Sequence, residues 1–217
     1  MEQEQTRNDE SSTIKLDRGM TVQEVNLLLT APMGDKERAF FRAVYDTFYR
    51  ANELLQCNIE DYNKSTGELT CLKPKSHYSR TLMKVVQPPP KHMVLSPSTQ
   101  LLFKKIIGNR KKGAIFVNRQ GNRCSITYFQ MYINDVATKL GIQKVTHITP
   151  KCERYHLVTL QALREAGERH TDLAGADSDV TARGSQHSAQ VKEKYYKKSG
   201  WDEVQAQVKK YHPSFRD

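Results

Sequence analysis

The chain has 217 residues, the size of one domain or of one domain with a short appendage. Hydrophobic residues make up 37% and charged residues 27%, a composition that permits a packed core and excludes a wholly disordered chain. No apolar run approaches the ~20 residues of a transmembrane helix, and the N-terminus lacks the pattern of a secretory signal. The sequence therefore predicts an intracellular protein with no membrane partner.

Lys and Arg total 34 against 24 Asp and Glu, giving a formal net charge of +10. The excess is concentrated, because seven basic residues and no acidic one lie from Lys104 to Arg123. Such charge favours nucleic acid as a partner through phosphate neutralisation, the alternative being an ordinary solvated basic surface. No C-x-x-C pair occurs, so zinc and disulfide frameworks are not expected and no cofactor is predicted. The cysteines are Cys57, Cys71, Cys124 and Cys152.

The fold class predicted is α+β, mostly helical with one small antiparallel sheet. Residues 1–18 are polar and are expected to form a flexible arm or linker, and residues 19–217 one domain. A capping box, Thr21 with Glu24, marks the first helix. Apolar periodicity and end signals predict helices at about 22–30, 36–49, 51–55, 97–107, 125–140, 149–167 and 191–198, and a tail helix within about 199–217.

Strand patterns are fewer. Residues 69–72 and 81–86, on either side of a turn at Ser76-His77, predict a β-hairpin that the prolines at 88–90 terminate. Residues 114–117 predict a short buried strand.

Four motifs in chain order resemble those of the tyrosine recombinase (phage integrase) family. Residues 47–61 resemble its T-G-L-R-x-x-E-L-L motif, and residues 116–141 its helix that ends in Gly. Residues 149–167 resemble T-P-H-x-x-R-H…E-A-G, and residues 186–196 resemble G-H-S…Y. Each motif alone is weak, but four in order over about residues 19–200 are a strong signal.

The resemblance implies that Arg50 and Arg154 bind the non-bridging oxygens of a DNA phosphate. Guanidinium groups suit this task, because they are always charged and offer a rigid fork of donors. The structural alternative for Arg50 is an ion pair with Glu53 or Glu60. For Arg154 it is a surface charge on a helix.

Family spacing implies a tyrosine nucleophile on a late helix. Tyr196 lies nine positions after His187 and is preferred, whereas Tyr195 shares a helical face with Val191 and is the better core residue. The alternative is that both tyrosines only pack. His187 would donate a hydrogen bond to a phosphate oxygen.

The general acid of the family is a hairpin lysine. Lys75 is the preferred candidate for the general acid, because residues 74–80 resemble a K-x-g-k-x-R pattern, and Lys73 is the second candidate. An exposed lysine without a catalytic role is the alternative. The other six histidines have no metal-ligand spacing and are expected to be structural.

The sequence departs from the family pattern at three positions and in the length of one segment. Lys151 occupies the position of a histidine and can still contact phosphate, Tyr155 replaces the second histidine, and Gln186 replaces a glycine. The segment from Gly167 to His187 is also longer than usual. These changes are compatible with weak or lost activity.

The function that the resemblance implies is site-specific DNA recombination or integration through a 3′-phosphotyrosyl intermediate, without metal or ATP. Double-stranded DNA is the expected partner, with four protomers acting together, a tail helix docked on a neighbour, and room for an accessory DNA-binding domain or protein. The alternatives are a topoisomerase-like nicking-closing enzyme and a non-catalytic DNA-binding protein on a decayed recombinase scaffold.

Overall fold

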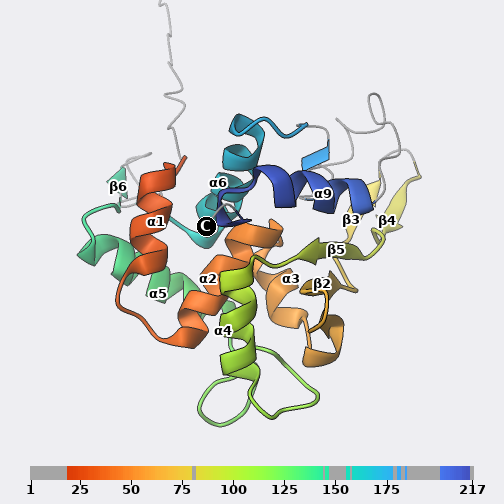
Figure 1. Ribbon diagram of the computed structural model, residues 1–217, viewed down its shortest axis with the longest axis horizontal. Helices are drawn as coiled ribbons and strands as arrows, with labels where there is room; N and C mark the ends of the chain where they lie inside the picture. Colours follow the sequence, from red (N-terminus) through yellow and green to blue (C-terminus); the bar gives the residue numbers. More distant parts are fainter. Residues whose placement is uncertain are drawn as a thin grey trace, which may run out of the picture.

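The computed structural model describes residues 19–79, 82–143, 145–146, 155–156, 158–177, 180–181, 184 and 201–215. Helix α2 (Asp35–Thr47) lies at the centre and packs against α4 (Pro97–Ile107) and α6 (Leu160–Leu173). Helices α1 (Val22–Thr30) and α5 (Ile126–Lys139) lie on one side of α2, and a small sheet lies on the other (Figure 1). The predicted α+β class is confirmed. None of the described helices is long and apolar enough to cross a membrane.

The first helix forms as its capping signal predicts. The Thr21 side chain accepts from the Glu24 N–H at 3.1 Å, and the Glu24 carboxylate accepts from the Thr21 N–H at 2.8 Å. Two donors that a helix start leaves without an internal partner are thereby satisfied. The apolar face of α1 is buried, so the capping box also fixes how α1 enters the core.

Aromatic side chains of α2 and α5 form the centre of the core. The rings of Phe40 and Phe129 stack with centroids 3.8 Å apart, and Phe116 meets Phe40 edge-on at 5.1 Å. All three side chains are fully buried. The periodicity prediction for both helices is therefore confirmed, since their apolar stripes face each other.

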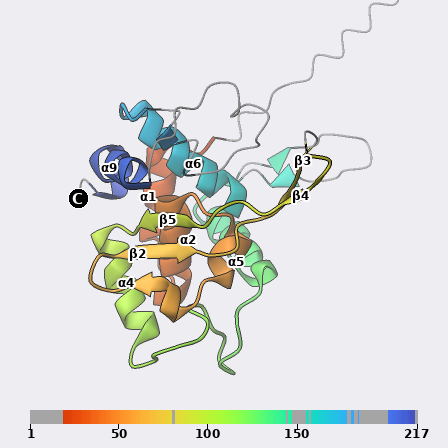
Figure 2. The ribbon, with the colours of Figure 1, turned by 90° about the vertical axis from the view of Figure 1, so that its right-hand side faces the viewer.

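The sheet differs from the predicted hairpin. Strand β2 (Glu68–Cys71) pairs with β1 (Tyr62–Asn63) and with β5 (Lys91–Val94), in the order β1-β2-β5, all antiparallel. Strand β4 (Lys84–Val86) instead pairs with β3 (His77–Ser79) in a separate ladder that projects from the body (Figure 2). The reason is burial, because β5 places apolar side chains in the core, whereas the residues of β4 are exposed or, at Val86, half-buried.

Two further predictions are wrong in detail. Residues 114–117 form no strand, since only isolated bridges, Asn58 to Ala114 and Val117 to Arg123, tie this segment to its neighbours. Residues 155–156, expected within a helix, form β7 (Tyr155–His156), which pairs with β6 (Val145–Thr146). Helix α6 begins only after the Thr159 N-cap.

Gly167 lies inside α6 rather than at its end. A Cβ atom on this residue would stand 2.2 Å from the Tyr45 carbonyl oxygen and 3.1 Å from a ring carbon of Phe48. The glycine therefore serves close packing of α6 on α2, and its selection here is steric rather than a helix-stop signal.

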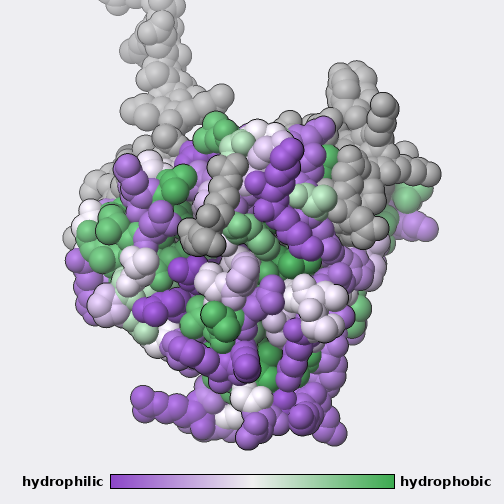
Figure 3. Space-filling model, viewed as in Figure 1, coloured by the Kyte–Doolittle hydropathy of each residue, from purple (hydrophilic) through white to green (hydrophobic). Residues whose placement is uncertain are grey.

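Part of the basic segment is structural. The Arg110 guanidinium donates to the carbonyl oxygens of Ile106, Ala114 and Ile115, and Arg123 donates to that of Leu55. These contacts tie the loop to α3 (Ala51–Gln56) and α4. The exposed basic side chains of this region belong to Lys104, Lys105, Lys111, Lys112 and Arg119. Figure 3 shows hydrophilic side chains gathered at this end of the molecule, below α4.

Helix α9 (Trp201–Tyr211) covers the core opposite α4 (Figure 1). Its Val204 and Val208 side chains are buried, and α9 packs against β5 and α6 of the same chain. The docking of the tail on a neighbouring protomer, which the resemblance suggests, stays a prediction; within this chain α9 packs on its own domain. The short helix η2 (Pro213–Phe215) follows it.

The tail is held by a buried histidine, which makes stability pH-dependent. His212 is fully buried, and its Nε2 lies 3.0 Å from the Tyr45 carbonyl oxygen. Burial lowers the pKa of His212 to about 4, with the charge of Asp46 opposing the shift and His170 adding to it. In the unfolded chain the pKa returns to about 6.5.

Because the unfolded state binds the proton first, stability is expected to fall by about 3 kcal/mol as the pH drops from 6.5 to 4. Urea unfolding at several pH values measures this loss. His212→Asn should be less stable at pH 7 but should show a flatter pH profile. Some dependence remains in that variant, because burial also lowers the pKa of His170. An unchanged profile in His212→Asn would contradict the assignment.

Candidate active site

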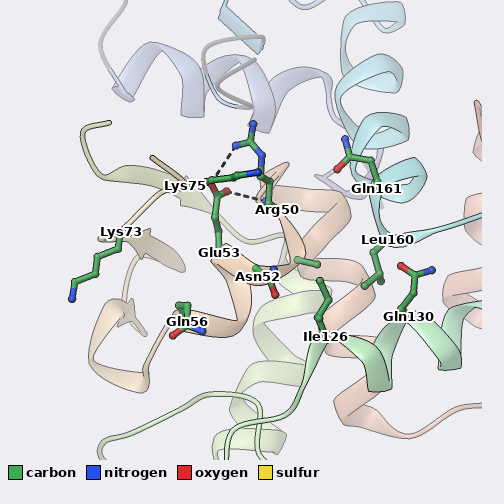
Figure 4. Close-up of a pocket in the computed structure, with 11 residues that line it drawn as sticks. Arg50, Asn52, Glu53, Gln56, Lys73, Lys75, Ile126, Gln130, Leu160 and Gln161 are labelled. Atoms are coloured by element: carbon green, nitrogen blue, oxygen red, sulfur yellow. Dashed lines mark hydrogen bonds and ion pairs between the residues drawn. The ribbon is translucent and has the colours of Figure 1, made fainter. Parts of the chain in front are cut away.

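A pocket of about 450 Å³ opens beside α3 (Ala51–Gln56), where the segment after β2 meets the first turns of α5 and α6 (Figure 4). Three cationic side chains and four amide side chains line it, together with one carboxylate and three apolar residues. Eleven residues line it: Arg50, Ala51, Asn52, Glu53, Gln56, Lys73, Lys75, Ile126, Gln130, Leu160 and Gln161. Two of the predicted site residues, Arg50 and Lys75, therefore share one pocket.

Arg50 is presented by a tight turn between α2 and α3. Phe48 adopts a left-handed conformation with φ of 55°, which is uncommon for a bulky residue, and Arg50 then caps the N-terminus of α3. Arg164 on α6 is fully buried, and its Nε donates to the Phe48 carbonyl oxygen at 2.6 Å. This contact holds the strained turn from the side of α6.

The sheet holds the same turn from the opposite side. The buried Tyr49 hydroxyl lies 2.7 Å from the Leu69 carbonyl oxygen and 2.8 Å from that of Lys91. Burial raises the pKa of Tyr49 well above its ordinary value, so this phenol stays protonated and acts as a structural donor. Arg50 is therefore fixed by contacts from both α6 and the sheet.

Glu53 connects the cationic groups of the pocket. Its Oε1 lies 3.2 Å from Arg50 Nη1 and accepts from the Lys75 backbone N–H at 2.9 Å. Its Oε2 accepts from the Arg50 backbone N–H at 2.9 Å and from Lys91 Nζ at 2.8 Å. The predicted ion pair of Arg50 with Glu53 is thus present, yet the Arg50 side chain remains 32% exposed at the pocket.

The charge state of Glu53 follows from these contacts. Burial acts to raise its pKa, but the charge of Lys91 and the hydrogen bonds from Lys75, Lys91 and Arg50 outweigh it and lower the pKa below its ordinary value. Glu53 is therefore a carboxylate at neutral pH. It serves as a fixed acceptor rather than as a proton donor.

Lys75 and Lys73 differ in position. The backbone of Lys75 is anchored to Glu53, and Gln87 anchors the preceding Pro74 carbonyl oxygen. Both lysines line the pocket, but Figure 4 shows the Lys75 side chain beside Arg50 and the Lys73 side chain pointing away from Arg50. Of the two lysines, Lys75 is therefore the one whose side chain lies beside Arg50.

If Lys75 supplies the proton for the leaving oxygen, Lys75→Ala should slow DNA cleavage by about 10²-fold or more. Lys73→Ala is the matched control, with the same charge change on the same loop, and should slow it less than about threefold. Single-turnover cleavage of a labelled duplex measures both. Equal losses in the two variants would show that general loop charge, not a proton donor, is responsible.

The far wall of the pocket consists of helix starts. Ile126 and Gln130 come from the first turns of α5, and Leu160 and Gln161 from the first turn of α6. The side chains of Ser125 and Thr159 cap these helices. Helix N-termini carry a positive partial charge, so both helices add to the positive potential of the pocket.

The other predicted residues cannot be placed in this geometry. Lys151, Arg154, His187 and Tyr196 lie outside the described residues, as do the alternative nucleophile Tyr195 and the arm at 1–18. Among the residues that are described, no group of three or more His, Cys, Asp or Glu side chains is arranged to hold a metal ion.

Two residues of this region are absent from the sequence-based expectations. Arg164 shares a helical face with Leu160, Gly167 and Thr171, a phase that marks it as core-facing. Burial lowers the pKa of Arg164, and the charge of Arg50 adds to this shift. Lys91 has a weaker signal, namely its alternation with Met93 in a strand that the sequence did not predict.

No protein-family profile and no curated protein sequence matches the chain. Solved structures do match it. The integrase from mycobacterium phage Brujita has a TM-score of 0.63 at 12% identity, over 89% of this chain and 57% of that one. The Tn1549 transposon integrase in complex with transposon right end DNA has a TM-score of 0.58 at 14% identity, over 88% of this chain and 65% of that one.

The XerH site-specific recombinase, bound to its difH substrate in a pre-cleavage complex, has a TM-score of 0.59 at 15% identity. That match covers 92% of this chain and 51% of the other. The chain thus spans between half and two thirds of the length of these three proteins. At such low identities the likeness establishes architecture: the described chain has the fold of tyrosine recombinases and integrases.

Proposed function

We propose that the protein binds double-stranded DNA and cleaves and rejoins it through a 3′-phosphotyrosyl intermediate, as a site-specific recombinase or integrase. The observation that carries the proposal is the meeting of Arg50 and Lys75 in one pocket around the Glu53 carboxylate. The recombinase fold and the description of two structural neighbours as complexes with DNA support it.

The chemistry assigns one task to each group. Arg50, with Arg154, neutralises the charge that builds up on the non-bridging oxygens of the scissile phosphate, and Lys151 and His187 donate further hydrogen bonds to it. The Tyr196 hydroxyl gives its proton to solvent water, and its oxygen forms a bond to phosphorus. The bond from phosphorus to the 5′-oxygen breaks, and Lys75 gives that oxygen a proton.

Rejoining reverses these steps. A 5′-hydroxyl of the same or of a second DNA end attacks the phosphotyrosyl phosphorus, and Tyr196 leaves with its proton restored. The phosphodiester energy is kept in the covalent link, so the proposed cycle consumes no ATP and uses no metal ion. Exchange between two duplexes requires one nucleophile for each of four strands, which is the basis for proposing a homo-tetramer on DNA.

A nicked duplex tests the proposal. Cleavage next to a nick releases a short fragment, so the covalent complex is trapped and survives denaturation. Wild type, Tyr195→Phe, Tyr196→Phe and the double variant are mixed with such duplexes in the presence of a chelator. The duplexes derive from DNA that flanks the gene or from a random-sequence pool.

The expected result is a denaturation-resistant protein–DNA band that Tyr196→Phe alone abolishes. Loss in Tyr195→Phe alone would keep the mechanism and move the nucleophile by one residue. DNA binding without any band would favour the non-catalytic scaffold. The departures at Lys151, Tyr155 and Gln186 are the reason for considering that alternative. Relaxation of supercoiled DNA without strand exchange would favour a nicking-closing enzyme.

A further inference from the structure

A buried ion pair lies directly behind the pocket. Lys91 is fully buried, Glu53 is 4% exposed, and Lys91 Nζ lies 2.8 Å from Glu53 Oε2. Lys91 is the first residue of β5, where it pairs opposite Cys71, and it does not line the pocket. Buried ion pairs add little stability compared with apolar residues of similar volume, so this pair calls for a functional explanation.

The carboxylate of this pair faces the cations of the pocket. Through Oε1 it holds the Arg50 guanidinium and the Lys75 backbone, the two residues proposed to act on phosphate and leaving oxygen. Such an anchor has an electrostatic drawback. An unscreened carboxylate draws the Arg50 charge towards the protein and opposes the approach of a phosphate.

Lys91 offsets that drawback. Together Arg50, Lys75, Lys91 and Glu53 carry a formal charge of +2, and without Lys91 it would be +1, while Glu53 would keep its ion pair with Arg50. Burial lowers the pKa of Lys91, but the charge of Glu53 opposes the lowering. The Tyr49 ring, 5.6 Å from Lys91 Nζ, gives the ammonium a further favourable contact.

We propose that Lys91 is a positioning residue of the pocket, which offsets the charge of Glu53 so that Arg50 stays directed at a DNA phosphate. Lys91 touches neither DNA nor the reacting atoms and acts through Glu53. This assignment rests on the proposed function, because it concerns the same pocket. The competing explanation is a purely structural ion pair.

A substitution cycle separates the two explanations. Wild type, Lys91→Met, Glu53→Gln and the double variant are compared in single-turnover formation of the covalent complex on the nicked duplex, with protein in excess. The amplitude reports the folded, competent fraction, and the rate constant reports how well the site is arranged. Lys139→Met is the charge control, since it removes an exposed lysine that pairs with Asp135 on α5.

Lys91→Met is expected to lower the rate constant about tenfold or more at nearly unchanged amplitude, as removal of a supporting partner typically does. Lys139→Met should stay within about twofold of wild type. In the Glu53→Gln background no carboxylate charge needs an offset, so Lys91→Met should change the rate constant by less than about twofold.

Three results would overturn the proposal. The first is a lower amplitude with an unchanged rate constant in Lys91→Met, the result expected if the ion pair only stabilises the fold. The second is a rate constant for Lys91→Met equal to that of wild type. The third is the same loss in both backgrounds, which would mean that Lys91 does not act through Glu53. If Lys91→Met alone does not fold, the double variant keeps the proposal open to refutation, since it leaves no unpaired buried charge: a rate constant that differs more than about twofold between Glu53→Gln and the double variant would overturn the proposal.

A second readout does not depend on cleavage. Phenylglyoxal modifies arginine, and peptide mass spectrometry follows Arg50 and Arg42 separately. In Lys91→Met the uncompensated Glu53 should hold the Arg50 guanidinium more tightly and slow its modification about threefold or more, while Arg42 reacts as in wild type. If wild type forms no covalent complex, the proposed function fails. Unchanged Arg50 reactivity would then still refute the role of Lys91.

Discussion

Replacing Arg50 by alanine is expected to slow DNA cleavage about 10²–10³-fold, the loss typical of one preorganised donor to a developing oxyanion. The guanidinium lines the pocket while the turn at Phe48 and the Glu53 carboxylate fix its position. DNA affinity should change far less, because one phosphate contact among many is lost. Single-turnover rates together with binding titrations measure the two effects separately.

Arg42→Ala is the matched control for this result. Arg42 lies on α2, eight residues before Arg50, and its Nη1 donates to the Ser98 hydroxyl at 2.9 Å rather than to a pocket residue. Arg50→Lys should restore the positive charge but not the two-pronged donor geometry of a guanidinium. Its cleavage rate should therefore lie between those of Arg50→Ala and wild type. Equal cleavage rates for Arg50→Ala and Arg42→Ala would show that Arg50 has no role in the reaction.

Gly167→Ala is expected to cost about 3 kcal/mol of unfolding free energy, although alanine favours helix over glycine by about 1 kcal/mol. The added Cβ would stand 2.2 Å from the Tyr45 carbonyl oxygen, so α6 must move away from α2. The same movement would loosen Arg164 from the Phe48 carbonyl oxygen and thus the turn that presents Arg50.

Chemical denaturation of Gly167→Ala beside Glu165→Ala measures this cost. Glu165 is exposed on the same helix, so its replacement should change the stability by less than about 0.5 kcal/mol. A Gly167→Ala variant as stable as wild type would show that the two helices can separate without loss, and that close packing is not the reason for the glycine.

Local signals predicted most of the helices. The Thr21 and Glu24 capping box lies at the start of α1, and α5 runs between its Ser125 cap and Gly141 as its apolar stripe indicates. Such features depend on neighbours within a few residues, which a single sequence contains. The resemblance to recombinase motifs added the architecture, which the structural comparisons bear out.

Strand pairing was predicted less well, because it depends on residues far apart. The partner of β2 is β5, beyond the prolines at 88–90, and not the nearer residues 84–86. β2 pairs with β5 because one face of the sheet must be buried, and which strand can supply that face is decided only when the core is assembled. Lys91 was missed for the same reason, since a lysine is rarely buried and its partner Glu53 lies 38 positions away.

The most direct measurement of the central claim is identification of the amino acid that becomes linked to DNA. Wild-type protein reacts with the nicked duplex in chelator, nuclease trims the DNA, and trypsin releases the short peptide Tyr195-Tyr196-Lys197 for fragmentation by mass spectrometry. The account predicts a 3′-phosphonucleotide on Tyr196 and a free 5′-hydroxyl on the released strand. An adduct on any residue other than these two tyrosines, or cut DNA with no adduct, would contradict it.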